Sequence, residues 1–208
     1  MAAFLGNLRN VVIASFVLAI LLIGVYCVTQ GFDGPAFELF CLRWLHIVSG
    51  VMWIGLLWYF NFVQIPTMPK VPAELKGGVT GYIAPAALFW FRWGAMGTIF
   101  FGIVLAARNH YLIEAYTLDL SEGTAGWPLV PKYLAIGIGM WLGTIMWFNV
   151  WFVIWPNQQK ALNIGGKYPD LPADQKAAAA KSAMVFSRIN TLLSIPMLFS
   201  MVAAGHLY

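Results

Sequence analysis

The chain has 208 residues, of which 61% are hydrophobic and only 10% are charged, with a formal net charge of +4. Soluble domains carry about a quarter charged residues and somewhat under half apolar ones. This composition excludes an ordinary soluble enzyme, a disordered chain and a nucleic-acid-binding protein, and it predicts an integral membrane protein. The two cysteines, Cys27 and Cys41, form no CxxC or CxxCH motif, which excludes zinc ribbons, iron–sulfur clusters and covalently attached c-type haem. They leave two alternatives, a disulfide or two isolated thiols.

Five segments are long and apolar enough to span a bilayer, which takes roughly 20 mainly apolar residues. We expect these spans at residues 11–29, 43–65, 88–107, 130–155 and 187–207. The first is interpreted as a retained anchor helix, because its apolar run is too long for a signal peptide and no A-x-A cleavage site follows it. The other four predict a four-helix bundle. The predicted fold is therefore all-α, with residues 1–208 forming a single transmembrane domain, and the Ala-rich run before the last span predicts a short surface helix.

The basic residues of the loops divide unequally between the two ends of the spans. The end that holds the N-terminus carries Arg9, Lys70, Lys76, Lys160, Lys167, Lys176 and Lys181. The opposite end carries Arg43, Arg108 and Lys132, together with Asp33, Glu38, Glu114, Asp119 and Glu122. Because basic loops stay in the cytoplasm, this pattern predicts a bacterial inner membrane protein with a cytoplasmic N-terminus and a periplasmic C-terminus. We expect membrane lipid, and no nucleic acid, as its surroundings.

One internal repeat is present. Residues 52–61 (MWIGLLWYFN) align with residues 140–149 (MWLGTIMWFN), and a proline follows each stretch, at Pro66 and Pro156. This indicates a parallel duplication of two helices, related by an axis along the membrane normal, and such repeats tend to place sites at their interface.

Polar residues at matching positions accompany the repeat. Asn61 and Asn149 are its last residues, and we expect them to make interhelical hydrogen bonds. Arg92 and Arg188 each lie 18 residues before a histidine. We expect these arginines to reach the inner membrane surface or to bind helix-end carbonyls.

The three histidines, His46, His110 and His206, all fall near the outer ends of predicted spans. His46 and His206 are expected at similar depth on helices that can face each other, which is what bis-histidine ligation of a haem b requires. His110 lies at loop level and is a reserve ligand, and Met201 is a weaker one. The alternative is that each histidine bonds a backbone carbonyl of a neighbouring helix or lies in water at the interface.

The neighbours of His46 suit a haem. Gly50 lies one turn below it on the same helix face and would admit a flat macrocycle, with Trp53 beneath. Arg43 lies one turn above, where a haem propionate would favour a cation. We therefore expect His46, His206, Arg43, Gly50 and Trp53 to form the cofactor site.

Three stretches carry a family resemblance: residues 43–55 (RWLHIVSGVMWIG), residues 143–158 (GTIMWFNVWFVIWPNQ), and residues 190–201 (NTLLSIPMLFSM) followed by His206. They resemble the urate oxidase N-terminal domain family, the membrane domain of cytochrome-c-dependent urate oxidases. The resemblance implies a membrane haem protein and a reaction in which urate is oxidised and electrons pass to a c-type cytochrome on the outer side. Because this chain has no CxxCH motif, we expect that cytochrome to be a separate protein.

Two functions follow as alternatives, and neither identifies a substrate or catalytic residues. The first is a haem-b redox protein that passes electrons near the outer face to a separate cytochrome or oxidase. The second is a non-catalytic accessory subunit of a larger membrane respiratory or oxidase complex. An ion-coupled transporter is disfavoured because no predicted span carries an acidic residue.

Overall fold

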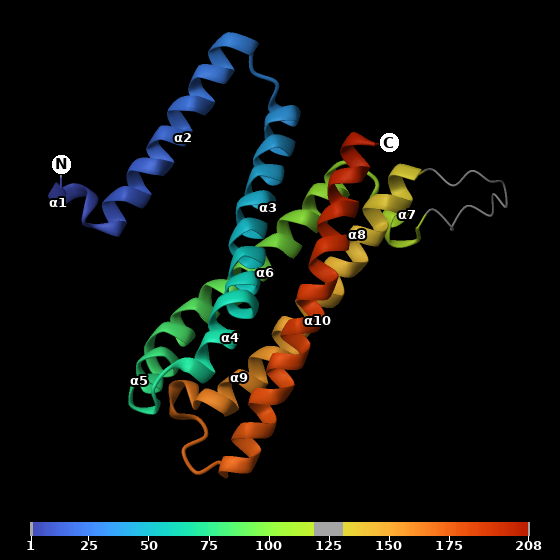
Figure 1. Ribbon diagram of the computed structural model, residues 1–208. Helices are drawn as coiled ribbons and strands as arrows, with labels where there is room; N and C mark the ends of the chain where they lie inside the picture. The colour runs from blue at the N-terminus through green and yellow to red at the C-terminus, as the bar shows by residue number, and fades with distance from the viewer. Residues whose placement is uncertain (1, 119–130, 208) are drawn as a thin grey trace. The chain divides into compact units, whose positions relative to one another are not determined.

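The computed structural model describes residues 2–118 and 131–207, and all regular elements within these ranges are helices (Figure 1). Five of the helical segments are long and apolar enough to cross a membrane, which matches the predicted all-α class. Asp119, Glu122 and residue 130, where the fourth span was expected to begin, lie outside the described residues.

The candidate spans are longer than predicted. They run over Leu8–Thr29, Gly34–Lys70, Ala73–Arg108, Lys132–Leu162 and Ala173–His206. A helix of 36 residues, such as Ala73–Arg108, is roughly 54 Å long, whereas the hydrocarbon layer is about 30 Å thick. Apolar patterning marks only the part of a helix that lies in lipid. The sequence-based prediction therefore underestimated the lengths of the helices. The Ala-rich run expected as a separate surface helix is the first part of α10 (Ala173–His206).

By its internal contacts the chain divides into two compact units, Met1–Cys41 and Leu42–Tyr208. The first unit holds α1 (Ala2–Leu5), α2 (Leu8–Gln30) and the beginning of α3 (Gly34–Trp58). The Oδ1 atom of Asn7 caps α2 by accepting from the backbone N–H of Arg9 at 3.0 Å. Apolar side chains of α2 are exposed all around the helix, as expected of an anchor in lipid. Cys27 and Cys41 are free thiols rather than a disulfide.

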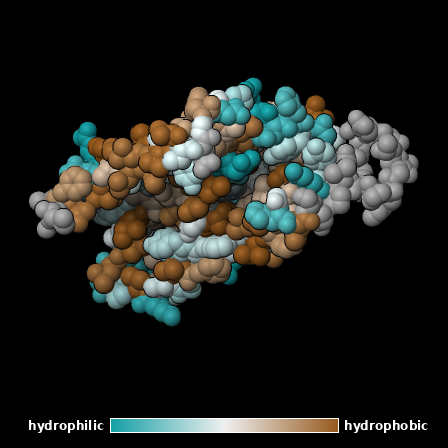
Figure 2. All heavy atoms as spheres, turned by 90° about the horizontal axis from the view of Figure 1, so that it is seen from above, coloured by the Kyte–Doolittle hydropathy of each residue, from teal (hydrophilic) through white to brown (hydrophobic). Residues whose placement is uncertain are grey.

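The second unit contains the rest of α3 and the remaining elements. In chain order these are η1 (Tyr59–Gln64), α4 (Ile65–Thr67), η2 (Met68–Lys70), α5 (Ala73–Gly78), η3 (Val79–Ile83), α6 (Ala84–Arg108), α7 (Leu112–Tyr116), α8 (Pro131–Phe148), η4 (Asn149–Ile154), α9 (Trp155–Leu162), η5 (Ile164–Gly166) and α10. Helices α8 and α10 lie side by side along most of their length (Figure 1). Figure 2 shows hydrophobic side chains over much of the visible surface, beside patches of hydrophilic ones.

Three π-helical segments, η1, η3 and η4, interrupt the long helices. A proline follows each of them by two residues, at Pro66, Pro85 and Pro156. Proline removes a backbone donor and its ring clashes with the carbonyl four residues earlier, so the preceding turn widens. Both copies of the sequence repeat therefore end in the same backbone feature.

One hydrophobic core joins the four long helices of the second unit. Its buried residues come from α3 and η1, from α6, from α8 and η4, and from α10, and they include Trp53, Leu57, Phe91, Met146 and Met197. Fully burying a large apolar side chain stabilises a fold by about 1.5–3 kcal/mol in water, although less of that gain applies where the alternative surrounding is lipid.

Candidate functional site

The imidazole of His46 joins α3 to α6. Its Nδ1 lies 2.8 Å from the carbonyl oxygen of Thr98. The ring lies against Gly102, where an added Cβ would come within 2.9 Å of the His46 Cε1 and Nδ1 atoms. A carbonyl can only accept, so Nδ1 carries the proton and Nε2 keeps its lone pair. Histidines that bind a metal through one ring nitrogen usually donate the N–H of the other ring nitrogen to a carbonyl or carboxylate, as Nδ1 of His46 does here.

The face of α3 below His46 is covered by α6. A Cβ at Gly50 would lie 3.8 Å from the Thr98 side chain, and Trp53 is fully buried in the core. A Cβ at Gly94 would come within 3.1 Å of the backbone nitrogen of Trp53. The room for a macrocycle that Gly50 was expected to leave is therefore occupied by a neighbouring helix.

The close approach of α3 and α6 depends on three small residues that the sequence analysis did not single out. Gly94, Thr98 and Gly102 follow one another at intervals of four and line the face of α6 that meets α3. Small residues at this spacing let helix backbones approach closely in membranes. The pattern was readable from the sequence as small-xxx-small-xxx-small.

The other predicted ligands belong to other elements of the fold. His206 is exposed in the last turn of α10, and its Nδ1 lies 3.2 Å from the carbonyl oxygen of Val202, which again leaves Nε2 free. His110 is exposed after the end of α6 and has a left-handed backbone conformation with φ of 59°. Met201 is half-buried and contacts the α8 backbone face at Gly139. The contacts that hold His46 and those that hold His206 share no residue.

Near His110, the short helix α7 packs on α8. A Cβ at Gly137 would overlap the carbonyl oxygen of Ala115. The Tyr116 hydroxyl lies 2.9 Å from the Thr144 hydroxyl, and the indole N–H of Trp141 donates to the Tyr116 carbonyl oxygen at 3.0 Å. The segment after α6 is thus anchored to the helix that follows it.

Arg43 lies near enough to Tyr111 in this region to act on it electrostatically. Burial raises the pKa of the Tyr111 phenol, and the positive charge of Arg43 partly opposes this by lowering it. The Tyr111 ring also stacks on Tyr133, with centroids 6.3 Å apart. Arg43 therefore acts electrostatically on a buried tyrosine, in addition to any role it has toward an anionic ligand.

A buried polar network crosses the core, as the repeat predicted. The Nδ2 of Asn149 donates to the Oδ1 of Asn190 at 2.9 Å, and the Nδ2 of Asn190 donates to the Met146 carbonyl at 2.9 Å. The Nδ2 of Asn61 donates to the Ser187 hydroxyl at 2.8 Å. The predicted interhelical hydrogen bonds of Asn61 and Asn149 are confirmed, and both go to α10.

The network leaves some polar atoms without partners. The indole N–H of Trp58 donates to the Ser194 hydroxyl at 3.0 Å. Among the described residues, six buried polar atoms have no hydrogen-bond partner: Trp53 Nε1, Asn61 Oδ1, Gln64 Oε1, Trp147 Nε1, Trp151 Nε1 and Gln158 Oε1. Buried polar atoms are usually paired, so such atoms point to a missing water or ligand.

The repeat-related arginines differ. Arg188 is exposed, as expected of a side chain that reaches the surface. Arg92 is half-buried, donates through Nε to the Leu88 carbonyl at 3.3 Å, and stacks over Trp155 with its Cζ 3.2 Å from the ring centroid. The carbonyl that it binds belongs to the interior of α6 and not to a helix end, and the aromatic stacking was not predicted either.

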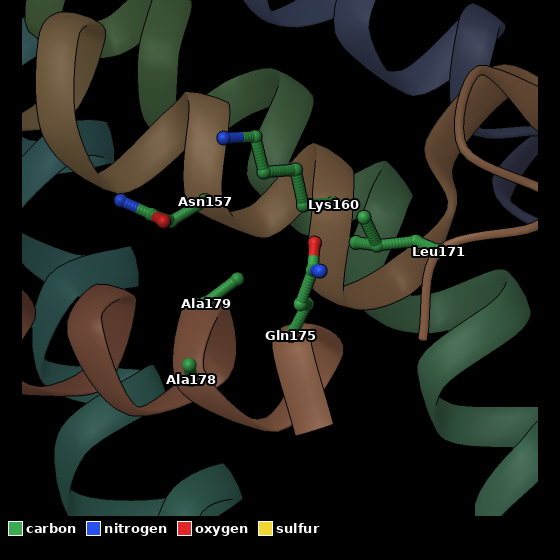
Figure 3. A pocket seen from close by; sticks show the side chains of 6 residues that line it. All are labelled: Asn157, Lys160, Leu171, Gln175, Ala178 and Ala179. Carbon is green, nitrogen blue, oxygen red and sulfur yellow. The ribbon is translucent and has the colours of Figure 1, made fainter. Parts of the chain in front are cut away.

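A hollow of about 300 Å³ opens between α9 and the beginning of α10, lined by Asn157, Lys160, Leu171, Gln175, Ala178 and Ala179 (Figure 3). Figure 3 shows Gln175 extending from α10 toward α9. The hollow lies at the opposite end of α10 from His206 and contains no histidine. Within the described ranges, no group of three or more His, Cys, Asp or Glu side chains could hold a metal ion.

The comparisons with known proteins bear on the C-terminal part of the chain. The model of the family described as urate oxidase N-terminal matches residues 129–207, which confirms the resemblance over α8, η4, α9 and α10. The matched region includes Asn149, Asn190 and His206, whereas His46 lies outside it. Neither the search of curated proteins nor the search of solved structures found a match.

Proposed function

We propose that the chain is a membrane redox protein that holds a haem b near its outer face and passes electrons to a separate cytochrome or oxidase. The observation that carries the proposal is the contact of His46 Nδ1 with the Thr98 carbonyl oxygen at 2.8 Å, a bond to a neighbouring helix that the alternative without a cofactor also predicts. It fixes the proton on Nδ1 and leaves Nε2 as a ligand on a ring held in place by two helices. The match to the urate oxidase N-terminal family supports a role in redox chemistry.

The donor chemistry fits such a group. His46 and His206 each have Nδ1 near a backbone carbonyl and Nε2 free, the state that an iron ligand requires. Gly50 and Trp53 offer no open cradle, since α6 and the core cover them. We therefore assign the ligand roles to His46 and His206, with His110 in reserve, and the propionate partner to Arg43.

Bound haem would supply reversible one-electron chemistry, and the protein would supply ligands, orientation and a low-dielectric surrounding. The Thr98 carbonyl would raise the basicity of His46 through the hydrogen bond to Nδ1. The Gly94, Thr98 and Gly102 face would keep α6 close enough to exclude water from that nitrogen. The proposed setting is a bacterial inner membrane with the C-terminus on the periplasmic side.

The second candidate is an accessory subunit of a larger membrane complex. It is favoured by large aromatic side chains exposed on the second unit, among them Trp90 at 56%, Trp93 at 50% and Phe152 at 59%. Aromatic surfaces of this kind suit either lipid or a partner helix. The core filled by Trp53 also suits a cofactor-free protein.

A reduced-minus-oxidised absorption spectrum of the purified chain, expressed with ample haem, separates the two candidates. A Soret band with sharp α and β bands, and a pigment extractable with acid acetone, would support the haem protein. A preparation of folded protein without a Soret band would support the accessory subunit.

A further inference from the structure

Arg92 carries a positive charge inside a helix long and apolar enough to cross the membrane. Its Nε donates to the Leu88 carbonyl, and its Cζ lies 3.2 Å from the ring centroid of Trp155 and 5.7 Å from that of Trp151. A guanidinium has five N–H donors, so this arrangement leaves the terminal nitrogens to bind something else. Stacking on two indoles holds the planar group in a fixed orientation.

A second unused donor lies in the same cluster. The Nε1 of Trp151 is buried and has no hydrogen-bond partner. Trp151 also meets Trp93 edge to face, with ring centroids 5.5 Å apart. The partly exposed guanidinium of Arg92 is the accessible donor of this cluster, and it favours an anion as its acceptor.

Among residues 2–118 and 131–207, no carboxylate pairs with Arg92. The carboxylates of the chain are Asp33, Glu38, Glu74, Glu114, Asp119, Glu122, Asp170 and Asp174, all outside residues 75–113 and 123–169. Within the described part of the chain, no ion pair of Arg92 is present, and its contacts are one carbonyl and two indoles. A charge inside a span is costly unless it is paired, which favours a partner from outside the described residues.

The surface beside Arg92 is apolar and aromatic. Trp93, Trp90 and Phe152 are 50%, 56% and 59% exposed. Indole and phenyl rings at the membrane interface pack against acyl chains, and a basic group between helices there binds lipid headgroups. The geometry favours an anion that carries its own hydrocarbon over a freely diffusing ion.

We propose that Arg92, Trp151 and Trp155 form a binding site for the phosphate group of an anionic phospholipid. The guanidinium donates to the phosphate oxygens through its terminal nitrogens, and the rings of Trp151 and Trp155 hold it in place. The acyl chains lie along Trp93 and Phe152. The site occupies the leaflet at which α9 begins, and with a cytoplasmic N-terminus this is the cytoplasmic leaflet, which is rich in anionic lipid.

The test compares lipid binding of the whole chain in detergent, measured by native mass spectrometry with added phosphatidylglycerol or phosphatidylcholine. We expect wild type to retain phosphatidylglycerol over phosphatidylcholine, and Arg92→Gln to lower phosphatidylglycerol retention about tenfold, the effect of removing a charge-assisted hydrogen bond. Arg92→Lys keeps the charge but not the planar fork, and we expect partial retention. The matched control is Arg188→Gln, which removes the exposed repeat-related arginine and should retain lipid as wild type does.

Competition with inorganic phosphate distinguishes a site for a lipid phosphate group from a site for free phosphate. We expect millimolar phosphate to leave phosphatidylglycerol bound, because the acyl chains contribute to binding. Displacement by phosphate would contradict the lipid assignment. Equal retention of both lipids by wild type would also overturn the proposal, and this outcome does not depend on how well any variant folds. Equal loss in Arg92→Gln and Arg188→Gln would likewise overturn it, because binding would then follow net charge alone.

Discussion

The Nδ1 atom of His46 lies 2.8 Å from the carbonyl oxygen of Thr98, so a side chain of α3 uses a backbone group of α6. Thr98 has its own hydroxyl bound to the Gly94 carbonyl at 2.7 Å. Gly102 completes the site by leaving space for the imidazole. The same contact fixes the tautomer of His46 and holds two helices together, which links the proposed ligand to the packing of the fold.

Replacement of Gly102 by alanine should disturb this arrangement. The new Cβ would lie 2.9 Å from two atoms of the His46 ring, which must then move away from the Thr98 carbonyl. We expect a loss of about 1–3 kcal/mol in the free energy of unfolding, measured by denaturation in detergent. The control is Gly55→Ala, where nothing lies within 4 Å of the new Cβ, and which should be neutral or slightly stabilising. Equal effects of the two substitutions would show that His46 does not depend on this space.

Replacement of Asn190 by alanine should destabilise the core. Asn190 is fully buried, accepts from Asn149 and donates to the Met146 carbonyl, so its loss leaves a buried donor and a buried acceptor unpaired. We expect a cost of about 1–3 kcal/mol. The control is Thr191→Ala, whose hydroxyl bonds only the Ser187 carbonyl of its own helix. A double-mutant cycle with Asn149→Ala measures the coupling, and a coupling of zero would contradict the interhelical bond.

Alkaline pH should lower the free energy of unfolding through the titration of Tyr111. Burial raises the pKa of Tyr111 above the value of about 10 in an unfolded chain, so above that pH the unfolded state releases its proton first. The stability of wild type should therefore fall as the pH rises above about 10. Tyr111→Phe should lose less stability than wild type over this interval, whereas Tyr82→Phe, at a side chain that is 80% exposed, should follow wild type. Identical pH profiles for all three proteins would exclude a buried phenol.

Arg43 should modulate the same titration. Its positive charge lowers the pKa of Tyr111, so Arg43→Gln should raise that pKa further and extend the alkaline loss of stability to higher pH. The effect of Arg43→Gln on the pH profile is measured twice, in wild type and in Tyr111→Phe. A difference that persists without the phenol would mean that Arg43 acts on another group.

The sequence predicted the features that follow from composition and residue pattern, namely the membrane spans and the buried amide pairs. Hydropathy located all five candidate spans, and the repeat located Asn61 and Asn149, because lipid forces buried amides to pair with other helices. Helix ends were predicted too short, because residues beyond the hydrocarbon layer stay helical without an apolar signal. The π segments were also missed, although the prolines that follow them were visible.

The candidate site could be predicted only in part. The choice of His46 depended on its position in a span, which the sequence gives directly. Its partner Thr98 lies 52 residues away, and the covering of Gly50 by α6 depends on which helix faces meet. The spacing of residues within α3 does not tell which helix packs on the face that holds His46. The space for a cofactor expected below His46 therefore could not be checked against α6. The stacking of Arg92 on Trp155 likewise depends on which helices pack together, so the sequence alone did not predict it.

The most direct test of the central claim is the haem-to-protein ratio of three single variants, His46→Ala, His206→Ala and His110→Ala, each purified after expression with ample haem. The account predicts that His46→Ala and His206→Ala lose the Soret absorbance while His110→Ala retains it, because His110 is exposed at the end of α6 and His46 is held by Thr98. Retention of haem in His46→Ala together with its loss in His110→Ala would contradict the account and place the ligand pair on the repeat-related helices instead.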